Sequence, residues 1–353
     1  MASARTPAQV YRRFGEVDAA GTSPLYERVA VALSESEEAL RAIATAPARK
    51  RSPAVVLAAL HDLALAGRAP ALAAAYAAGD ADAAADAAVD VLLRMTGSVV
   101  ATAVRRRVRA DETGRCAVLH PAVAEAAHRV GAASVGLIDV GCSAGLNLNV
   151  GRVFIAYGDG RSLGDPTSPV RQSCAVVGDR PVPARPMPRV VTRIGVDPDP
   201  VDVTDADEVR WLRACVWPDR RERAARLDAE LALAAADPPL LLRGDAVDVL
   251  PEAFARVPPD VLPVVTTTWA LSGLSPEDRL RFLDRLGEAA ARRPVAWVSA
   301  EGVGVAPKAP TLGDRRASGH SIVGVAVFDG ATAHVEAVGR CWSRGRLLAW
   351  LAG

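Results

Sequence analysis

The sequence predicts an α/β protein with a doubly wound, Rossmann-like sheet that follows an all-helical N-terminal domain. Residues 1–130 place apolar residues at helical spacing, whereas short β-branched runs alternate with helical segments from residue 131 onward. A glycine-containing turn directly follows the first of these runs, as in nucleotide-binding sheets. The 353 residues are enough for two domains. We therefore predict a helical domain over 1–130 and an α/β domain over 131–353.

Composition excludes several classes of partner. The 42 Lys and Arg residues nearly cancel the 41 Asp and Glu residues, so net charge gives no attraction to nucleic acid or to an anionic membrane. The longest charge-free run, 261–276, is shorter than the roughly 20 apolar residues of a membrane-spanning helix. The N-terminus has no apolar stretch typical of a signal peptide. We expect a cytoplasmic protein without nucleic-acid or membrane partners.

The cysteines and histidines argue against a metal site. The five cysteines are scattered and include no C-x-x-C pair, and the histidines show no H-x-x-x-H pairing. We predict reduced thiols, no disulfide framework and no bound metal.

The helical domain is predicted from apolar spacing and from its helix breakers. Leu25, Val29 and Leu33 recur at intervals of four, and a second apolar pattern runs over 55–65. Prolines and glycines divide the region into several helices. The breakers are Pro24, Pro47, Pro53, Gly67, Pro70 and Gly79.

The α/β domain is predicted from five apolar strands and the helices between them. The strands are expected over 135–140, 190–196, 239–243, 261–267 and 294–299. The helices are expected over 145–153, 205–214, 219–236 and 275–292. Alternation of this kind is typical of a parallel sheet covered on both faces.

Two segments depart from that alternation. Six prolines over 157–189 predict an insertion of loops and short strands within the α/β domain. Near the C-terminus, strand-like runs over 321–328 and 332–341 flank Asp329-Gly330, which predicts an antiparallel hairpin.

The most informative motif follows the first predicted strand. Asp139, Gly141, Ser143 and Gly145 fit a D-x-G-x-G-x-G pattern in which serine replaces the middle glycine. A dinucleotide fingerprint, G-x-G-x-x-G, does not fit, and no G-K-[ST] of a P-loop follows. A tight strand-to-helix turn that merely requires glycine is the structural alternative.

The pattern resembles motif I of class I S-adenosylmethionine-dependent methyltransferases, which implies S-adenosyl-L-methionine as cofactor and the methyltransferase type of sheet. Asp197 ends the second strand, where a carboxylate can accept hydrogen bonds from ribose hydroxyls. A helix N-cap is the alternative role for an acid here.

Later strand ends extend the resemblance. Gly244-Asp245-Ala246 resembles the adenine site, with Asp245 accepting from the exocyclic amine and the Ala246 N–H donating to the ring. An N-cap is again the alternative for Asp245. Thr267 ends the fourth predicted strand, and Trp269 follows it. In the methyltransferase fold this segment faces the reacting methyl group. Trp269 either contacts the sulfonium through cation–π attraction or belongs to the core. The terminal hairpin resembles the antiparallel sixth and seventh strands of the fold.

More narrowly, the chain resembles an uncharacterised bacterial family, a domain of unknown function, over nearly its whole length. This resemblance supports the fold and supplies no substrate. It is carried by 23–26 (SPLY), 113–116 (TGRC), 141–148 (GCSAGLNL), 164–166 (GDP), 168–171 (SPVR), 195–197 (GVD), 200–202 (PVD), 211–213 (WLR), 217–218 (WP), 244–246 (GDA) and 301–302 (EG).

Further candidates have plausible structural roles as well. Arg115 could clamp a carboxylate bidentately or cap a helix. Asn147, a poor helix former at a helix start, could bind the methionine carboxylate. His120 could act as a general base, although a lone histidine is more often structural. Tyr26 and Glu301 are the remaining catalytic candidates.

We expect an S-adenosylmethionine-dependent methyltransferase that acts on an unknown small molecule. Methyl transfer needs mainly alignment, so few catalytic side chains are required. The alternatives are another S-adenosylmethionine-using reaction, such as cyclisation or aminocarboxypropyl transfer, and a non-catalytic binding or regulatory protein. The sequence leaves the oligomeric state open.

Overall fold

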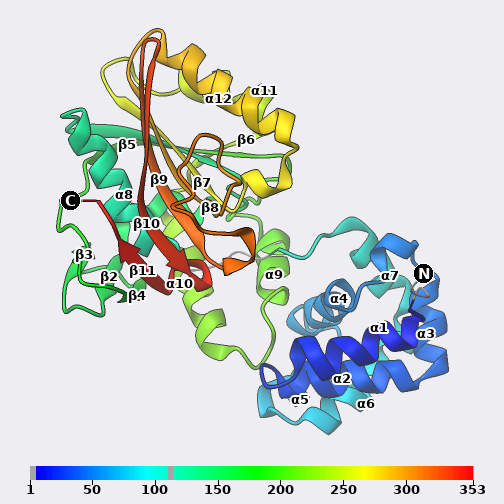
Figure 1. The fold of residues 1–353 in the computed structure, drawn as a ribbon. Helices are drawn as coiled ribbons and strands as arrows, with labels where there is room; N and C mark the ends of the chain where they lie inside the picture. The colour runs from blue at the N-terminus through cyan, green and yellow to red at the C-terminus, as the bar shows by residue number, and fades with distance from the viewer. Residues whose placement is uncertain (1–4, 110–113, 353) are drawn as a thin grey trace. The chain divides into compact units, whose positions relative to one another are not determined.

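The computed structural model of the chain describes residues 5–109 and 114–352 and shows a mixed α/β architecture with an N-terminal helical region and a large sheet (Figure 1). Two compact units divide the chain. Unit 1 comprises Met1–Asp111 and Asp205–Asp228, and unit 2 comprises Glu112–Thr204 and Ala229–Gly353. Each unit is therefore built from two separate stretches of sequence, which differs from the predicted division at residue 130.

Unit 1 is helical, and proline begins several of its helices. Pro24, Pro53 and Pro70 each occupy the first turn, where the missing N–H costs no hydrogen bond. The predicted apolar residues Leu25, Val29 and Leu33 are all buried in its core. The helical segments are α1 (Pro7–Arg13), η1 (Phe14–Ala19), α2 (Pro24–Glu35), α3 (Glu37–Ala44), η2 (Ala48–Lys50), α4 (Pro53–Leu65), α5 (Pro70–Ala78), α6 (Ala81–Arg94), α7 (Thr96–Arg105), α9 (Ala206–Ala214) and the first part of α10 (Arg221–Ala236).

Helix α9 joins unit 1 although the sequence analysis placed it in the α/β domain. Trp211 of α9 is 1% exposed within the unit 1 core, and its indole Nε1 donates to the Arg107 carbonyl at 2.8 Å. Arg210 forms an ion pair with Asp62 of α4 at 2.9 Å. Burial of this large aromatic ring in the unit 1 core makes α9 part of unit 1, and the spacing of residues along the chain does not reveal that burial.

Unit 2 is built on one sheet, which has 11 strands within the described residues. Its order is β3-β2-β4-β11-β10-β9-β8-β7-β1-β5-β6, and the last five strands of that order are parallel to one another. The strands are β1 (Ser134–Val140), β2 (Phe154–Tyr157), β3 (Ser162–Gly164), β4 (Arg171–Val176), β5 (Arg189–Asp197), β6 (Leu240–Arg243), β7 (Leu262–Thr268), β8 (Val295–Gly302), β9 (Ser321–Asp329), β10 (Thr332–Trp342) and β11 (Leu347–Trp350).

The seven predicted strands of the α/β region are confirmed, and the predicted hairpin is the β9–β10 pair with Gly330 at its turn. β9 pairs antiparallel with β8, so the C-terminal strands extend the sheet as a meander. The proline-rich insertion contributes β3 and β4, and β4 pairs with β11 at that side of the sheet. Strand β11 had no counterpart among the predicted strands.

Helices cover both faces of the sheet. Helix α8 (Cys116–Arg129) packs on β7, β8 and β9, whereas α11 (Ala246–Ala255) and α12 (Pro276–Ala290) contribute to a separate core on the other face. The strand interior is apolar on both sides, as expected for a covered parallel sheet. Short helical turns complete the unit: η3 (Leu146–Arg152), η4 (Leu271–Gly273), η5 (Arg316–Ser318) and η6 (Ser343–Gly345).

The predicted α-helix over 145–153 is instead the 3₁₀ segment η3. Gly145 precedes it in a left-handed conformation, and Asn149 is drawn into a hydrogen bond from Arg193 at 2.7 Å. Asparagine side chains compete with helical hydrogen bonding in this way.

Within the described residues, no single helix combines the length and the apolar character needed to cross a membrane. Two sharply bent pairs of consecutive helices meet both criteria when the two helices of a pair are counted together. None of the five cysteines forms a disulfide.

Candidate functional site at the carboxyl ends of the parallel strands

The order of the parallel strands defines where a ligand would bind. Numbered along the chain, β6-β5-β1-β7-β8 is the order 3-2-1-4-5 of a doubly wound sheet. β5, the next strand of this parallel set along the chain, pairs with one side of β1, and the later strand β7 pairs with the other side of β1. Loops therefore diverge at the carboxyl ends of β1 and β7, and such a point is where open α/β sheets bind their ligands.

The loop after β1 has a repeating left-handed backbone. Gly141, Ser143 and Gly145 have φ values of +72°, +49° and +68°. A Cβ on Gly141 would lie 2.8 Å from the Cβ of Ala270, which follows β7, so the two loops approach closely at this point. The alternating glycine pattern is thus explained by backbone conformation, and Ser143 adopts the conformation that glycine would take more easily.

Asp139, predicted to bind the cofactor, is buried inside the sheet. It is 1% exposed; its carboxylate accepts from the Thr266 hydroxyl at 2.6 Å and from Asn147 Nδ2 at 3.3 Å. Burial raises its pKa to about 6. In this position Asp139 orients Asn147.

Asn147, Arg115 and Trp269 come together around a residue that the sequence analysis missed, Thr268. The Thr268 hydroxyl accepts from Asn147 Nδ2 at 3.2 Å and from Arg115 Nη1 at 3.1 Å. The Arg115 guanidinium lies 5.0 Å from the centre of the Trp269 ring, within cation–π range. Because side chains alternate along a strand, the predicted Thr267 points to the other face, where it accepts from Trp297 Nε1 at 3.1 Å.

Trp269 is held in an unusual conformation. Its φ is +56°, which is costly for a bulky residue. Its indole Nε1 donates to the Ser321 hydroxyl at 2.7 Å. The next two N–H groups, of Ala270 and Leu271, donate to Glu301 Oε1 at 3.0 and 3.2 Å. Fixed strain of this kind is characteristic of binding and active sites.

Glu301 supports the turn after β7 from beneath. It is 0% exposed, and burial raises its pKa to about 7. Its hydrogen bonds come from the Ala270 and Leu271 N–H groups and from the Thr267 hydroxyl, so the geometry shows a positioning role.

Asp197 is joined directly to the loop after β1. Its Oδ2 accepts from the Ser143 N–H at 2.9 Å, and its Oδ1 accepts from the Asp199 N–H at 2.8 Å. It is 9% exposed at the end of β5. A carboxylate oxygen has two lone pairs, so each oxygen can accept a further hydrogen bond.

Asp245 and Ala246 follow β6 as predicted. Asp245 is the N-cap of α11, and its Oδ1 accepts from the Val247 N–H at 2.9 Å. Ala246 is the first residue of that helix and is buried. The structure thus shows the helix-capping role that the sequence left as an alternative.

Two catalytic candidates make no hydrogen bond to this network within the described residues. His120 is 1% exposed within α8, and burial lowers its pKa to about 4, so the ring is neutral at pH 7. Its Nδ1 has no hydrogen-bond partner among the described residues. Tyr26 belongs to unit 1, where it is buried and its hydroxyl donates to the Leu57 carbonyl at 3.3 Å.

A further polar cluster at this edge of the sheet was also missed. Asp314 accepts from Arg340 Nε at 2.6 Å and pairs with His320 Nε2 at 2.9 Å. The His320 ring lies 5.3 Å from the ring of Trp342. Ser321 pairs with Gly302, the last residue of β8, so this cluster is beside the same strand ends. His320 and Arg340 lie six and 26 residues after Asp314, and no sequence spacing signals the cluster.

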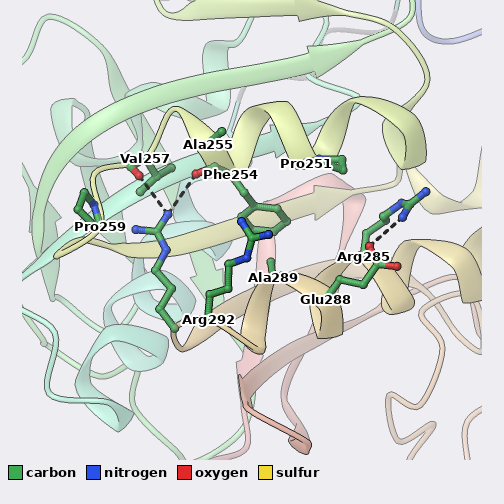
Figure 2. A pocket seen from close by; sticks show the side chains of 10 residues that line it. Pro251, Phe254, Ala255, Val257, Pro259, Arg285, Glu288, Ala289 and Arg292 are labelled. Carbon is green, nitrogen blue, oxygen red and sulfur yellow. Dashed lines mark hydrogen bonds and ion pairs between the residues drawn. The ribbon is translucent and has the colours of Figure 1, made fainter.

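A cavity of about 470 Å³ lies elsewhere in unit 2, between α11 and α12 (Figure 2). Arg293 donates there to the carbonyls of Phe254 and Val257 at 3.1 and 3.0 Å, and Arg285 pairs with Glu288. The two hydrogen bonds from Arg293 satisfy carbonyl groups at the end of α11 and just after it. The cavity is lined by the C-terminal parts of helices that follow the strand ends, so it does not adjoin the loops of the candidate site.

Within the described residues, no group of three or more His, Cys, Asp or Glu side chains is placed to hold a metal ion.

Comparison with known families gives one result. A sequence model of a family described as "Uncharacterized protein conserved in bacteria (DUF2332)" matches residues 8–350. No curated protein and no solved structure matches the chain. The match confirms the resemblance to an uncharacterised bacterial family, and the resemblance to methyltransferases stays a prediction.

Proposed function

The chain belongs to this uncharacterised bacterial family, DUF2332, and we propose that its α/β unit binds S-adenosylmethionine and transfers a methyl group to a small molecule. The observation that carries the proposal is the bond between Asp197 and the left-handed loop after β1. It joins the acid that we propose binds ribose to a glycine-patterned loop at adjacent strand ends, in the expected order. The proposal includes the methyltransferase type of sheet.

The residues present fit the cofactor. The loop after β1 has left-handed backbone at Gly141, Ser143 and Gly145, and Asp197 adds acceptors for ribose hydroxyls. Arg115 places a positive charge beside Asn147, which suits a carboxylate. Asp245 and Ala246 directly follow β6, at the strand end where the adenine of the proposed ligand would lie.

When bound, S-adenosylmethionine would supply an activated methyl group on a positively charged sulfonium. The protein's contribution is alignment: Asp197 and the loop after β1 hold one part of the ligand, and the Thr268 network fixes Arg115. The Trp269 ring face can stabilise positive charge. Glu301 keeps the turn that carries this ring in its strained conformation. Methyl transfer by alignment requires no further catalytic group.

Calorimetric titration with S-adenosylmethionine and S-adenosylhomocysteine tests the proposal. The wild type should bind both saturably, and Asp197→Ala should weaken binding at least tenfold, because hydrogen bonds to a charged group are lost. Asp197→Asn, which keeps one acceptor oxygen, should lie between them. Asp199→Ala is the matched control, since Asp199 is an exposed acid two residues away that pairs with Arg243.

The outcomes separate the alternatives. A folded wild type that binds neither compound would contradict the proposal. Binding without turnover over a panel of acceptors would favour a regulatory protein. Turnover that yields methylthioadenosine in place of S-adenosylhomocysteine would identify cyclisation or aminocarboxypropyl transfer.

A further inference from the structure

A cavity rich in basic side chains lies wholly within unit 1. Its volume is about 590 Å³, and it is lined by η2, the start of α4 and the end of α7 with the residues that follow. This volume falls within the roughly 300–1,000 Å³ that is typical of small-molecule sites. No acidic side chain is among its described lining residues, whereas five are basic: Arg49, Lys50, Arg105, Arg106 and Arg107.

Most of this positive charge is uncompensated. Arg106 pairs with Glu208 of α9, which fixes its guanidinium. The side chains of Arg49, Arg105 and Arg107 form no ion pair with a described residue. Cations gathered in this way repel one another, and an anion bound between them removes that repulsion.

The acids of the neighbouring helix α9 already have cations of their own. Asp207 and Glu208 are both in its first turn, and Asp207 lies close enough to Arg105 and Arg106 for its pKa to be lowered, chiefly by Arg210. Asp207 pairs with Arg210 at 2.7 Å, and Arg210 does not line the cavity. The excess of positive charge in the cavity therefore remains.

Backbone contacts hold one of the cations and add to the positive potential. Lys50 Nζ donates to the Arg106 carbonyl at 2.8 Å, and the ammonium keeps further N–H donors for a ligand. Ser52, which also lines the cavity, is the N-cap of α4, and its side chain makes no capping hydrogen bond. The N-terminal end of a helix carries a partial positive charge, which favours an anion beside these cations.

The end of α7 accounts for only part of the basic cluster. Cations interact favourably with the C-terminal end of a helix, which explains Arg105 in the last turn of α7 and Lys50 on the carbonyl just after it. Arg49 belongs to η2, and Arg107 lies beyond the C-cap of α7. Neither residue completes a helix end, so their presence needs another explanation.

Apolar side chains adjoin the basic groups. Val104 and Val108 line the cavity and are 42% and 43% exposed, and the buried Val55 lies in the same wall. Small-molecule sites combine apolar surface with a few polar groups that fix the orientation of the ligand. This cavity therefore suits a ligand that has both a strongly anionic group and an apolar group.

We propose that this cavity binds a small organic diphosphate. The phosphate oxygens accept hydrogen bonds from Arg49, Lys50 and Arg107, since guanidinium and ammonium groups are the usual phosphate ligands of proteins. The apolar part of the molecule packs against Val104 and Val108. The site is independent of the proposed S-adenosylmethionine site, because all of its lining residues belong to unit 1.

Calorimetric titration of the full chain tests the proposal with three probes. These are isopentenyl diphosphate, inorganic pyrophosphate and isopentenol, which lacks the phosphates. The wild type should bind both diphosphates at one site, isopentenyl diphosphate about fivefold more tightly because it buries an apolar group, and should not bind isopentenol. Affinity for both should fall as ionic strength rises from about 0.01 M to about 0.1 M.

Two sets of variants separate the roles of the lining residues. Arg49→Gln combined with Arg107→Gln should weaken binding of both diphosphates at least tenfold, because two charge-assisted hydrogen bonds are lost. Val108→Ser should weaken binding of isopentenyl diphosphate and leave that of pyrophosphate unchanged.

A matched pair of substitutions controls for net charge. Arg28→Gln combined with Arg94→Gln removes the same charge from exposed ion pairs with Asp82 and Asp90, away from the cavity lining, and should leave binding unchanged. Asp197→Ala should bind isopentenyl diphosphate like the wild type, which separates this proposal from the one for unit 2.

Four outcomes would overturn the proposal. They are a folded wild type that binds neither diphosphate, binding that survives loss of Arg49 and Arg107, and equal weakening by the control pair. The fourth is tighter binding of a single-stranded oligonucleotide or of anionic vesicles than of isopentenyl diphosphate, which would identify a polyanion-binding surface in place of a small-molecule site.

Discussion

At the residue scale, the candidate site combines strained backbone with buried carboxyl groups, and both lower the free energy of unfolding. Ser143 and Trp269 have positive φ without being glycine, and Asp139 and Glu301 are buried carboxyl groups. All four lie at or directly below the carboxyl ends of β1, β7 and β8. Strain and burial concentrated at one edge of a sheet are typical of functional sites, since a stable fold elsewhere compensates for them.

Ser143→Gly should raise the free energy of unfolding by about 0.5–1 kcal/mol, because glycine adopts the left-handed region without the Cβ penalty. Ser173→Gly, on the exposed face of β4, is the control and should lower it by a similar amount. Urea denaturation of both variants measures the difference. A loss of stability in Ser143→Gly would show that contacts of the serine side chain outweigh the backbone strain.

Glu301→Gln should change how stability depends on pH. The folded pKa of about 7 lies above the ordinary 4.5, so between these values the folded state keeps a proton that the unfolded state releases. Wild-type stability therefore falls as pH rises from 4.5 through 7, by roughly 3 kcal/mol from this group. The variant lacks this contribution, so its stability relative to wild type should rise over that window. Parallel denaturation profiles from pH 4.5 to 7.5 would contradict the assignment.

At the element scale, the strand β1, its left-handed loop and η3 act as one unit. The loop is fixed on one side by Asp197 of β5 and on the other by the close approach of Gly141 to Ala270. Asn147 of η3 is fixed from below by Asp139. The loop thus needs both neighbouring strands in place before it has a definite shape.

Gly141→Ala should destabilise unit 2 by about 1–3 kcal/mol, because φ is +72° and the new Cβ would lie 2.8 Å from that of Ala270. Gly287→Ala is the matched control in α12, where a Cβ meets nothing within 4 Å, and it should stabilise by about 0.5–1 kcal/mol. Thermal and urea unfolding measure both. Equal effects of the two substitutions would contradict the close-approach argument.

At the scale of the whole molecule, the two compact units differ in chemistry. Unit 2 offers polar groups at the ends of parallel strands, and unit 1 contains a cavity lined by the rings of His61, Tyr76 and Trp217. Ligand binding stabilises the unit that contains the site. The stabilisation grows with the ratio of the ligand concentration to the dissociation constant.

Hydrogen exchange should therefore locate the proposed ligand in unit 2. S-adenosylhomocysteine should slow exchange in the loops after β1, β5 and β7 and leave exchange in α4, α5 and the segment 215–218 unchanged. Mass spectrometry of peptides from each unit measures the pattern. Protection of the unit 1 segments by S-adenosylhomocysteine would contradict the assignment of its site to unit 2.

The sequence by itself determined the local elements and the residues whose backbone conformation is dictated by their own chemistry. Apolar periodicity located β1, β5, β6, β7 and β8, and Asp329-Gly330 located the β9–β10 hairpin. Glycines at 141 and 145 identified the loop after β1, and the family match confirmed the narrower resemblance. These features depend on spacing within a few residues.

Only the tertiary structure decided which distant residues meet. Thr268, and not the predicted Thr267, contacts Arg115, and Asp139 is buried. Asp245 caps a helix, and α9 and Tyr26 belong to unit 1. Trp217 lines the same cavity as Tyr76, and Asp314 pairs with His320 and Arg340. The physical reason is that burial and hydrogen bonding are satisfied by the packed whole, so the pattern within a segment does not specify its partner.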